Sequence, residues 1–296
     1  MRPRELIPVP TVNAPIMAAV DGSEHALDGV RWAARAAART HRPLHLVSVV
    51  DRPAFQFGEG IVTAQAFADA SRALADGALD VARSVVSEVA TDVETSGEIV
   101  VGRPALVLRD LTSRAHMMVL GRRGLGGVAG LLLGSVSTYV SSHASCPVVV
   151  VSEDPPTGGP VVVGVDGSPV SQAATEVAFA QASGLGVGLI AVHTYGGYTG
   201  VQTFDVVQQG RQRIVDEARA GLGSRLAGCL SDYPDVNVQT VVTIEEPAAQ
   251  IIEAASLAQL IVLGSRGHGG FRTLLLGSTS QAVLQVAHCP VMIVPG

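Results

Sequence analysis

Lysine is absent from this chain. All 20 basic residues among its 296 residues are arginines. A P-loop needs a lysine on the β- and γ-phosphates, a protein kinase needs a lysine on a strand, and Schiff-base chemistry needs an amine. The sequence therefore excludes these three mechanisms, and any phosphate site in this chain has to use other donors.

Aromatic residues, long apolar runs and paired cysteines are also scarce. Aromatics make up 4% of a chain that is 47% hydrophobic, so its cores have to consist of Val, Leu, Ile and Ala, as in buried parallel sheets. No run approaches the roughly 18 apolar residues of a membrane span, and residues 1–15 lack a signal-peptide pattern. We therefore expect a soluble, cytoplasmic protein without stable membrane insertion.

The three cysteines, Cys146, Cys229 and Cys289, have neither metal-ligand spacing nor a CxxC motif. We expect them to pack in the interior rather than to act as redox sensors. The net charge of −6 argues against general binding to nucleic acids or anionic membranes, which favours a basic surface. No nucleic-acid partner is expected.

Each half of the chain alternates short apolar runs with helix-like segments. Ser23 suits a helix N-cap, Pro43 marks the end of the helix that follows, and Pro104 opens another helix. Strands joined by helical crossovers lie parallel, so each half is predicted to be a doubly wound, Rossmann-like α/β domain: a five-stranded parallel sheet with flanking helices. In the first half, the predicted strands are residues 16–20, 44–50, 93–100, 117–120 and 146–151, and predicted helices cover 63–90 and 135–143.

This pattern occurs twice. Asp21 and Asp166 are 145 residues apart, while Gly121 and Gly264 are 143 residues apart, and matching Cys-Pro pairs repeat the second spacing. Such regular offsets indicate an internal duplication. The sequence predicts a first domain over residues 1–151, a linker over 152–159 and a second domain over 160–296.

A spaced glycine motif follows the fourth predicted strand of each half. In the first half it is Gly121-Arg-Arg-Gly124, nine residues, then Gly134-Ser-Val-Ser137; the second half repeats it from Gly264. Glycines at positive φ between a strand and a helix can expose consecutive N–H groups to phosphate oxygens, and the helix N-terminus adds a partial positive charge. The alternative is a tight turn that packs helix against strand. Two copies, each with a Gly-Ser helix start, favour phosphate binding.

The motif shares one edge of the predicted sheet with other candidates. Ligands of doubly wound sheets bind beyond the carboxyl ends of the strands. Asp21, the Val49 region and the glycine loop all lie at such ends, and so do Asp166 and Thr194 in the second half. Each aspartate precedes a glycine and could instead be a turn residue. His193 is expected to be a packed histidine, since Ser48 replaces it in the first half.

A strand that ends in Val-Asp-Gly-Ser, followed much later by Gly-x2-Gly-x9-Gly-Ser, resembles the universal stress protein family, in its tandem-domain, ATP-binding branch. The resemblance covers nearly the whole chain. It implies one ATP with Mg²⁺ in each domain, aspartates on the nucleoside and the backbone of Val49 and Thr194 on the adenine edge. The implied and candidate binding residues are Ala19, Asp21, Val49, Gly121, Arg122, Arg123, Gly124, Gly126, Gly127, Gly134, Ser135, Val136 and Ser137, then Gly164, Asp166, Thr194, Gly264, Ser265, Arg266, Gly267, Gly269, Gly270, Gly277, Ser278, Thr279 and Ser280.

Within that set, the arginines could pair with phosphate or be solvated loop charges, and the Gly-Gly pairs could be spacer. Ser135 and Ser278 are interpreted as helix caps that donate to phosphate rather than as nucleophiles. The halves differ at Ala19, where the family and the second half (Gly164) have glycine. An added methyl group would crowd the nucleoside. The second site, which also has His268 and Arg272 in its spacer, is therefore expected to bind better.

Three functional hypotheses remain open at this stage. The first is an ATP-dependent regulator or sensor in stress response or growth control, because no acid–base machinery recurs in both halves. The second is a slow ATPase or another enzyme that processes adenine nucleotides. The third is a nucleotide-free interaction protein. The strands at residues 148–151 and 291–294 are expected to pair the two domains as an internal pseudo-dimer, and a homodimer of chains is also expected.

Overall fold

The computed structural model describes residues 13–51, 61–125, 133–152, 157–194, 206–267 and 276–296. The chain divides into two compact units, Met1–Asp154 and Pro155–Gly296. The division falls within the segment 152–159 that the sequence suggests as a linker. Each unit is described separately below.

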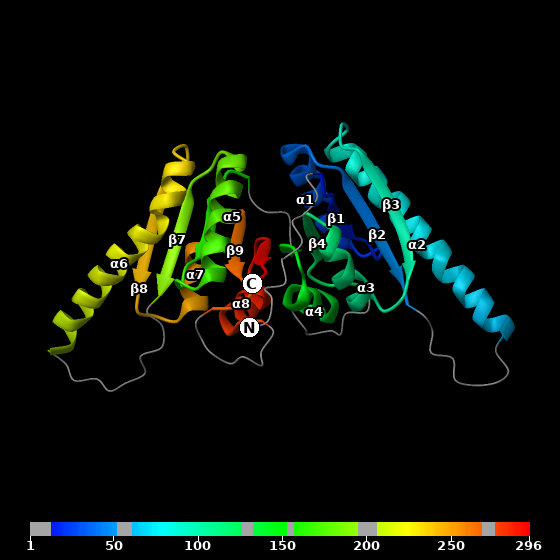
Figure 1. Cartoon of the computed structure of the whole chain (residues 1–296). Coiled ribbons are helices and arrows are strands. Elements are labelled where there is room, and N and C mark those ends of the chain that lie inside the picture. Colours follow the sequence, from blue (N-terminus) through cyan, green and yellow to red (C-terminus); the bar gives the residue numbers. More distant parts are fainter. Residues whose placement is uncertain (1–12, 52–60, 126–132, 153–156, 195–205, 268–275) are drawn as a thin grey trace, which may run out of the picture. The chain divides into compact units, whose positions relative to one another are not determined.

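The first unit is built on a five-stranded parallel sheet (Figure 1). The strand order is β3-β2-β1-β4-β5, so the chain moves outward from β1 on one side and then on the other. This reversal creates a switch point beside β1, where α/β sheets bind their ligands. The strands are β1 (Ile16–Ala19), β2 (Leu44–Val50), β3 (Thr95–Val101), β4 (Met117–Gly121) and β5 (Val148–Val151).

Helical crossovers connect these strands. The Ser23 hydroxyl caps α1, accepting a hydrogen bond of 3.2 Å from the amide of Ala26, and His41 ends that helix with φ +51°. The buried face of α1 consists mainly of alanines, which allow the helix to lie close to the sheet. The helical elements are α1 (Glu24–Thr40), α2 (Ile61–Val89), α3 (Pro104–Leu111), the short 3₁₀ turn η1 (Thr112–Arg114) and α4 (Ser135–His143).

The second unit repeats this architecture. Its strand order, β8-β7-β6-β9-β10, matches that of the first unit element by element. The prediction of two doubly wound domains with five parallel strands each is confirmed. The elements are β6 (Val161–Gly164), α5 (Pro169–Leu185), β7 (Leu189–Thr194), α6 (Val206–Asp232), β8 (Val238–Thr243), α7 (Pro247–Ala254), β9 (Leu260–Gly264), α8 (Ser278–Val286) and β10 (Val291–Val294).

Both cores are almost entirely aliphatic. Ile16, Leu46 and Met118 are fully buried in the first unit, and Leu189 and Ile261 in the second. Burying each such side chain stabilises the fold by about 1.5–3 kcal/mol before entropy is counted. The scarcity of aromatics thus reflects a core that consists of central strands covered by small-residue helices. Within the described residues, none of the helices combines the length and the hydropathy that crossing a membrane requires.

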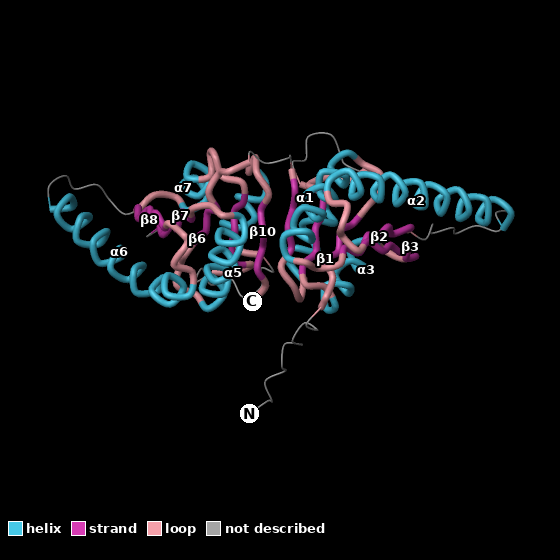
Figure 2. Tube along the Cα trace, turned by 90° about the horizontal axis from the view of Figure 1, so that it is seen from above, coloured by secondary structure: helices cyan, strands magenta, loops and turns pink. Residues whose placement is uncertain are grey.

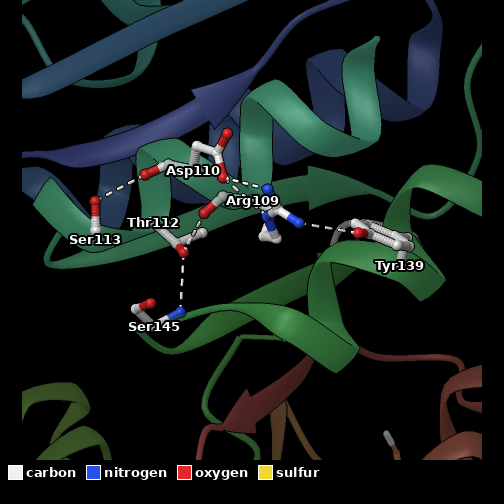
Figure 3. A network of polar contacts seen from close by, with 6 residues as sticks. All are labelled: Arg109, Asp110, Thr112, Ser113, Tyr139 and Ser145. Carbon is white, nitrogen blue, oxygen red and sulfur yellow. Dashed lines mark hydrogen bonds and ion pairs between the residues drawn. The ribbon is translucent and has the colours of Figure 1, made fainter. Parts of the chain in front are cut away.

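A polar network joins α3 to α4 in the first unit (Figure 3). The Arg109 guanidinium donates to the Tyr139 hydroxyl at 3.1 Å and pairs with Asp110, whose hydrogen bond raises the pKa of Arg109. The buried Thr112 hydroxyl donates to the Arg109 carbonyl at 2.6 Å and accepts from the Ser145 amide at 2.9 Å. This network positions α4, whose N-terminus faces the candidate site.

Thr112→Val should test that network, because valine keeps the side-chain shape but removes the hydroxyl. The two hydrogen bonds of the Thr112 hydroxyl, to the Arg109 carbonyl and from the Ser145 amide, are both lost, and we expect a loss of about 1–3 kcal/mol in the free energy of unfolding. Urea unfolding followed by circular dichroism measures it. The matched control is Ser113→Ala, which removes an exposed hydroxyl from the Asp110 carbonyl and should cost less than about 0.5 kcal/mol. Equal effects of the two variants would contradict the assignment.

Candidate functional site

The Asp-Gly-Ser turn forms one wall of the site in each unit. In the first unit, the Asp21 carboxylate accepts hydrogen bonds from the Ser23 amide (3.0 Å) and the Ser23 hydroxyl (2.6 Å). In the second, Asp166 accepts from the Ser168 amide at 2.9 Å. The glycine between them has φ +88° in the first unit and +85° in the second, a region that disfavours other residues. Each aspartate therefore acts as a turn residue, which is one of the two alternatives that the sequence leaves open; contact with a ligand stays a prediction.

The second carboxylate oxygen of Asp21 reaches the glycine loop. It accepts a hydrogen bond of 2.9 Å from the amide of Leu125, which lies 104 residues further along the chain. A Cβ atom on Gly124 would collide with this oxygen, and a Cβ on Gly267 would collide with the Asp166 carboxylate. Glycine at these two positions allows the aspartate to approach the loop closely.

The φ angles of the loop differ from the prediction. Gly121, Gly124 and Gly134 do not have positive φ, and the same holds for the second-unit counterparts of these described residues. The requirement for glycine is steric instead. A Cβ on Gly121 would lie 2.5 Å from the His25 carbonyl oxygen, and one on Gly264 would lie 2.9 Å from a methyl carbon of Val170. The loop glycines let the first crossover helix pack against the end of the strand.

The N-terminus of α4 presents free amides. Gly134 is its N-cap, with φ −72° and ψ 150°, and no side chain caps the helix. The first intrahelical bond runs from the Thr138 amide to the Gly134 carbonyl at 3.0 Å. The amides of Ser135, Val136 and Ser137 precede it and have no acceptor within the helix.

The prediction that Ser135 and Ser278 cap their helices is wrong. Both are the first helical residue, and the glycine before each takes the cap position. In α8, Gly277 has φ −65° and ψ 148°, and the first helical bond joins the Gln281 amide to its carbonyl. Because glycine offers no side-chain acceptor, the first-turn amides of both helices remain available to an anion.

The hydroxyls of Ser137 and Ser280 have a structural partner. Both side chains are buried; Ser137 donates to the Gly121 carbonyl at 2.8 Å and Ser280 to the Gly264 carbonyl at 2.7 Å. The sequence suggests that these hydroxyls hold ribose or phosphate. In the structure their hydrogens tie the helix to the preceding strand, so they position the loop.

A cavity of about 420 Å³ opens at the switch point of the first unit. Its floor is apolar and comes from the ends of β1, β2 and β4, with Leu108 of α3 on one side. The polar groups at its mouth are Asp21, Arg123 and the start of α4. The buried Nε atom of Arg123 has no hydrogen-bond partner among the described residues. Residues of the cavity wall are Ala19, Val20, Asp21, Ala26, Val47, Val49, Pro104, Leu108, Leu120, Gly121, Arg123, Gly124, Leu125, Leu133, Gly134, Ser135, Val136 and Ser137.

The difference between Ala19 and Gly164 has a packing explanation. Ala19 lines the cavity without closing it. In the second unit, a Cβ on Gly164 would lie 2.7 Å from a Leu263 methyl carbon and 3.1 Å from one of Ile251. Those side chains occupy the space that the missing methyl group leaves. The expectation that the second site binds better stays a prediction.

Several other candidates have defined places. The Arg122 amide donates to the Val151 carbonyl at 2.7 Å, and the Ser265 amide donates to the Val294 carbonyl at the same distance. His193 is buried and its Nδ1 lies 2.5 Å from the Val165 carbonyl, as expected of a packed histidine. Thr194 ends β7 at the position where Val49 lies in β2. Gly126, Gly127, His268, Gly269, Gly270 and Arg272 lie outside the described residues.

The apolar part of the cavity is the part that sequence reasoning missed. Pro104 and Leu108 contribute to it from α3, one helical turn apart, Val47 contributes from β2, and Val20 contributes from the residue directly after β1. The i, i+4 spacing of Pro104 and Leu108 is a helical-face signal, but it indicates burial equally well against a sheet or a ligand. Only the fold shows that this face borders a cavity.

Comparison with known proteins identifies the family. The model of the universal stress protein family matches residues 13–152 and again residues 159–295. The chain belongs to the universal stress protein family. A universal stress protein of Mycobacterium tuberculosis strain H37Rv is 38% identical over 292 residues, which cover 94% of this chain and 96% of the relative. Another, from Mycolicibacterium smegmatis, is 38% identical over 290 residues, covering 94% and 96%.

Solved structures of universal stress proteins share the fold. One from Archaeoglobus fulgidus has a TM-score of 0.68 at 19% identity, and the alignment covers 96% of this chain and 99% of that chain. A putative universal stress protein from Pseudomonas aeruginosa has a TM-score of 0.61 at 15% identity, covering 96% and 94%. At these identities the likeness shows the fold alone.

The cysteines of this universal stress protein are buried in both units. Burial raises the pKa of the Cys146 thiol to about 12 and that of Cys289 to about 11, and it also raises the pKa of Cys229. The thiolate is the reactive form, so these residues are unreactive near neutral pH. Packing, as predicted, is their role in the described structure.

Thiol titration with Ellman's reagent at pH 8 should show this burial. We expect all three thiols of the native protein to react at least about tenfold more slowly than in urea, because burial both shields them and disfavours the thiolate. A Cys229→Ser variant identifies the source of any partial native reaction, since Cys229 is the least enclosed. Rapid labelling of Cys146 or Cys289 in the native protein would contradict the packing role.

Proposed function

We propose that this universal stress protein binds ATP and acts as a nucleotide-dependent regulator. The main support for this proposal is the uncapped start of α4. Its residues Ser135, Val136 and Ser137 line the cavity together with Arg123, and their backbone amides have no acceptor within the helix. A helix N-terminus with free amides favours phosphate oxygens. The same uncapped start recurs at α8 in the second unit, which supports a second site.

Phosphate retention without lysine depends on these donors. Hydrogen bonds from amides to a charged phosphate contribute about 1.5–3 kcal/mol each. The Arg123 Nε, which has no hydrogen-bond partner in the described part of the chain, adds a guanidinium whose fixed geometry suits phosphate oxygens. This donor set fits a bound polyphosphate.

The apolar floor suits a nucleobase. Val47 and Val49 of β2 and Leu108 of α3 provide aliphatic surface on which a flat ring can pack. The cavity volume lies within the roughly 300–1,000 Å³ of small-molecule sites. A ligand with an apolar ring at one end and anionic groups at the other matches this division.

A magnesium ion fits this site only as a companion of the phosphates. Among the described residues, no group of three or more His, Cys, Asp or Glu side chains is arranged to hold a metal. Such an ion keeps several waters and takes few protein ligands when it accompanies phosphates, and its charge would balance theirs. Asp21 is the nearest carboxylate, and the protein already donates three hydrogen bonds to it.

The same engagement of Asp21 supports regulation over rapid catalysis. Asp21 is the one carboxylate among the described residues of the cavity wall. Three of the roughly four acceptor sites of this carboxylate take hydrogen bonds from the turn and the loop, so the fold fixes its position and leaves at most one site for a reactant. We therefore propose retention of the nucleotide as the main event, with slow hydrolysis as the second candidate.

Gly124→Glu combined with Gly267→Glu should abolish nucleotide binding. Each new side chain enters the space of an aspartate carboxylate and adds negative charge where phosphates would bind. The protein is purified, denatured and its supernatant analysed for nucleotide, and isothermal titration with MgATP follows. We expect nucleotide in the wild type and at least about 100-fold weaker binding in the variant, with unchanged far-UV circular dichroism.

Gly223→Glu is the matched control, because a side chain there meets open space on α6. It adds the same charge and should keep wild-type affinity. If the wild-type protein does not bind ATP at millimolar ATP concentration, the proposal is wrong and a nucleotide-free interaction protein is favoured. Turnover well above ~1 s⁻¹, the low end of typical enzymes, would favour the enzyme.

Ser135→Ala and Ser137→Ala should separate ligand contact from loop positioning. The exposed Ser135 hydroxyl has no partner among the described residues, so its loss should weaken MgATP binding about three- to tenfold at unchanged stability. The Ser137 hydroxyl supports the Gly121 carbonyl, so its loss should cost about 1–2 kcal/mol in unfolding free energy. Titration calorimetry and urea unfolding measure the two quantities. The reverse pattern would contradict these roles.

A further inference from the structure

The Asp-Gly-Ser turn has nearly the same backbone in both units. The glycine has φ +88° at Gly22 and +85° at Gly167. The cap residues Ser23 and Ser168 have φ −79° and −69°, with ψ 154° and 156°. Each cap hydroxyl accepts a hydrogen bond from the amide three residues later, at 3.2 Å and 3.1 Å. The backbone amides of the two turns therefore point in corresponding directions.

The second unit supplies an acceptor of its own to two of these amides. The Ser171 side chain, which is 4% exposed, comes from the first turn of α5. Its hydroxyl oxygen accepts hydrogen bonds from the Gly167 amide at 3.1 Å and the Asp166 amide at 3.3 Å. The hydroxyl donates its own hydrogen to the Ser168 carbonyl at 3.1 Å. Both lone pairs and the hydrogen of this hydroxyl are thus used within the turn.

The first unit has an alanine in place of this serine. Ala26 precedes Ser171 by 145 residues, which is also the offset between Asp21 and Asp166. A methyl group accepts no hydrogen bond. The amides of Asp21 and Gly22 accordingly have no acceptor in the part of the chain that the structure describes. Because backbone amides in folded proteins are almost always paired, these two require an acceptor from outside the chain.

This part of the turn borders the middle of the cavity. Val20, Asp21 and Ala26 belong to the cavity wall. In the sheet β1 lies between β2 and β4, and Figure 2 shows β2 and then β3 beside it. The apolar floor that suits a nucleobase includes β2, whereas the glycine loop and the uncapped helix start follow β4. A nucleotide that spans the two therefore has its sugar at the end of β1.

We propose that the Asp21 and Gly22 amides of the first site donate to a ribose hydroxyl oxygen of the nucleotide, and that Ala26 leaves the room for it. In the second unit the Ser171 hydroxyl takes the position of that oxygen, so the second site lacks this contact. The inference rests on the proposed nucleotide binding and adds a difference in specificity: the first site distinguishes a ribose from a deoxyribose more strongly than the second. Which site binds ATP more tightly is a separate question.

Exchanging the two residues tests the proposal. Isothermal titration with the magnesium complexes of ATP, 2′-deoxyATP and 3′-deoxyATP gives the sugar discrimination, which is the larger deoxynucleotide Kd divided by the Kd of ATP. Gly267→Glu leaves the first site alone, and Gly124→Glu leaves the second. Ala26→Ser should lower the discrimination of the first site at least about fivefold, because the new hydroxyl takes the amides. Ser171→Ala should raise that of the second site at least about fivefold, because it frees them.

Each exchange introduces a residue that the other unit already has at that position, and circular dichroism checks that the variants are folded. The matched controls are Ala38→Ser, at an exposed position of α1, and Ser183→Ala, whose hydroxyl on α5 donates to Asp235 rather than to the turn. Neither control should change the discrimination by more than about twofold.

An unchanged discrimination in either Ala26→Ser or Ser171→Ala would overturn the proposal and indicate that water serves the two amides. Absence of ATP binding to the wild type would overturn the proposed function and this inference with it. ATP binding with a discrimination that the exchanges do not move would overturn this inference alone.

Discussion

The Asp21 carboxylate is the point on which the geometry of the candidate site depends. One oxygen holds the turn at the end of β1 and the other holds the glycine loop after β4 through the Leu125 amide. The parallel pairing of β1 with β4 brings these distant segments to the same edge of the sheet. Gly124 is required because any side chain there would take the place of the carboxylate. The start of the glycine loop takes its position beside the cavity from this contact.

Duplication gave two units with one topology and different surfaces. The network of Arg109, Thr112 and Tyr139 joins α3 to α4 in the first unit. The corresponding residues of the second unit, 143 positions later, are Ile252, Ala255 and Ala282, whose apolar side chains cannot form these hydrogen bonds. The exposed Leu74 and Val81 of α2 correspond to the polar Glu217 and Ser224 of α6 at the 143-residue offset. The features common to both units are the turn, the loop glycines and the uncapped helix start. Common features point to the shared site, and the differences point to roles that each unit has alone.

Much of the fold could be predicted because its signals are local. Apolar runs, prolines and the Ser23 cap predict the strands and helices to within a few residues. The duplication predicts the second unit from the first. The same reasoning failed at the loop, where glycine was assigned a positive φ and Ser135 a capping role. A glycine in sequence does not reveal whether it serves φ freedom or close approach, because that depends on which atoms lie opposite.

The sequence by itself determined the class of this protein: two doubly wound domains of the universal stress protein family, with candidate phosphate loops and no lysine to serve them. Tertiary structure decided what the individual residues do. Packing of α1 against β4 requires Gly121, the buried Ser137 hydroxyl binds a backbone carbonyl, and Leu108 faces a cavity. These roles arise from contacts between residues far apart in the chain, and periodicity and spacing carry information only about neighbours along it.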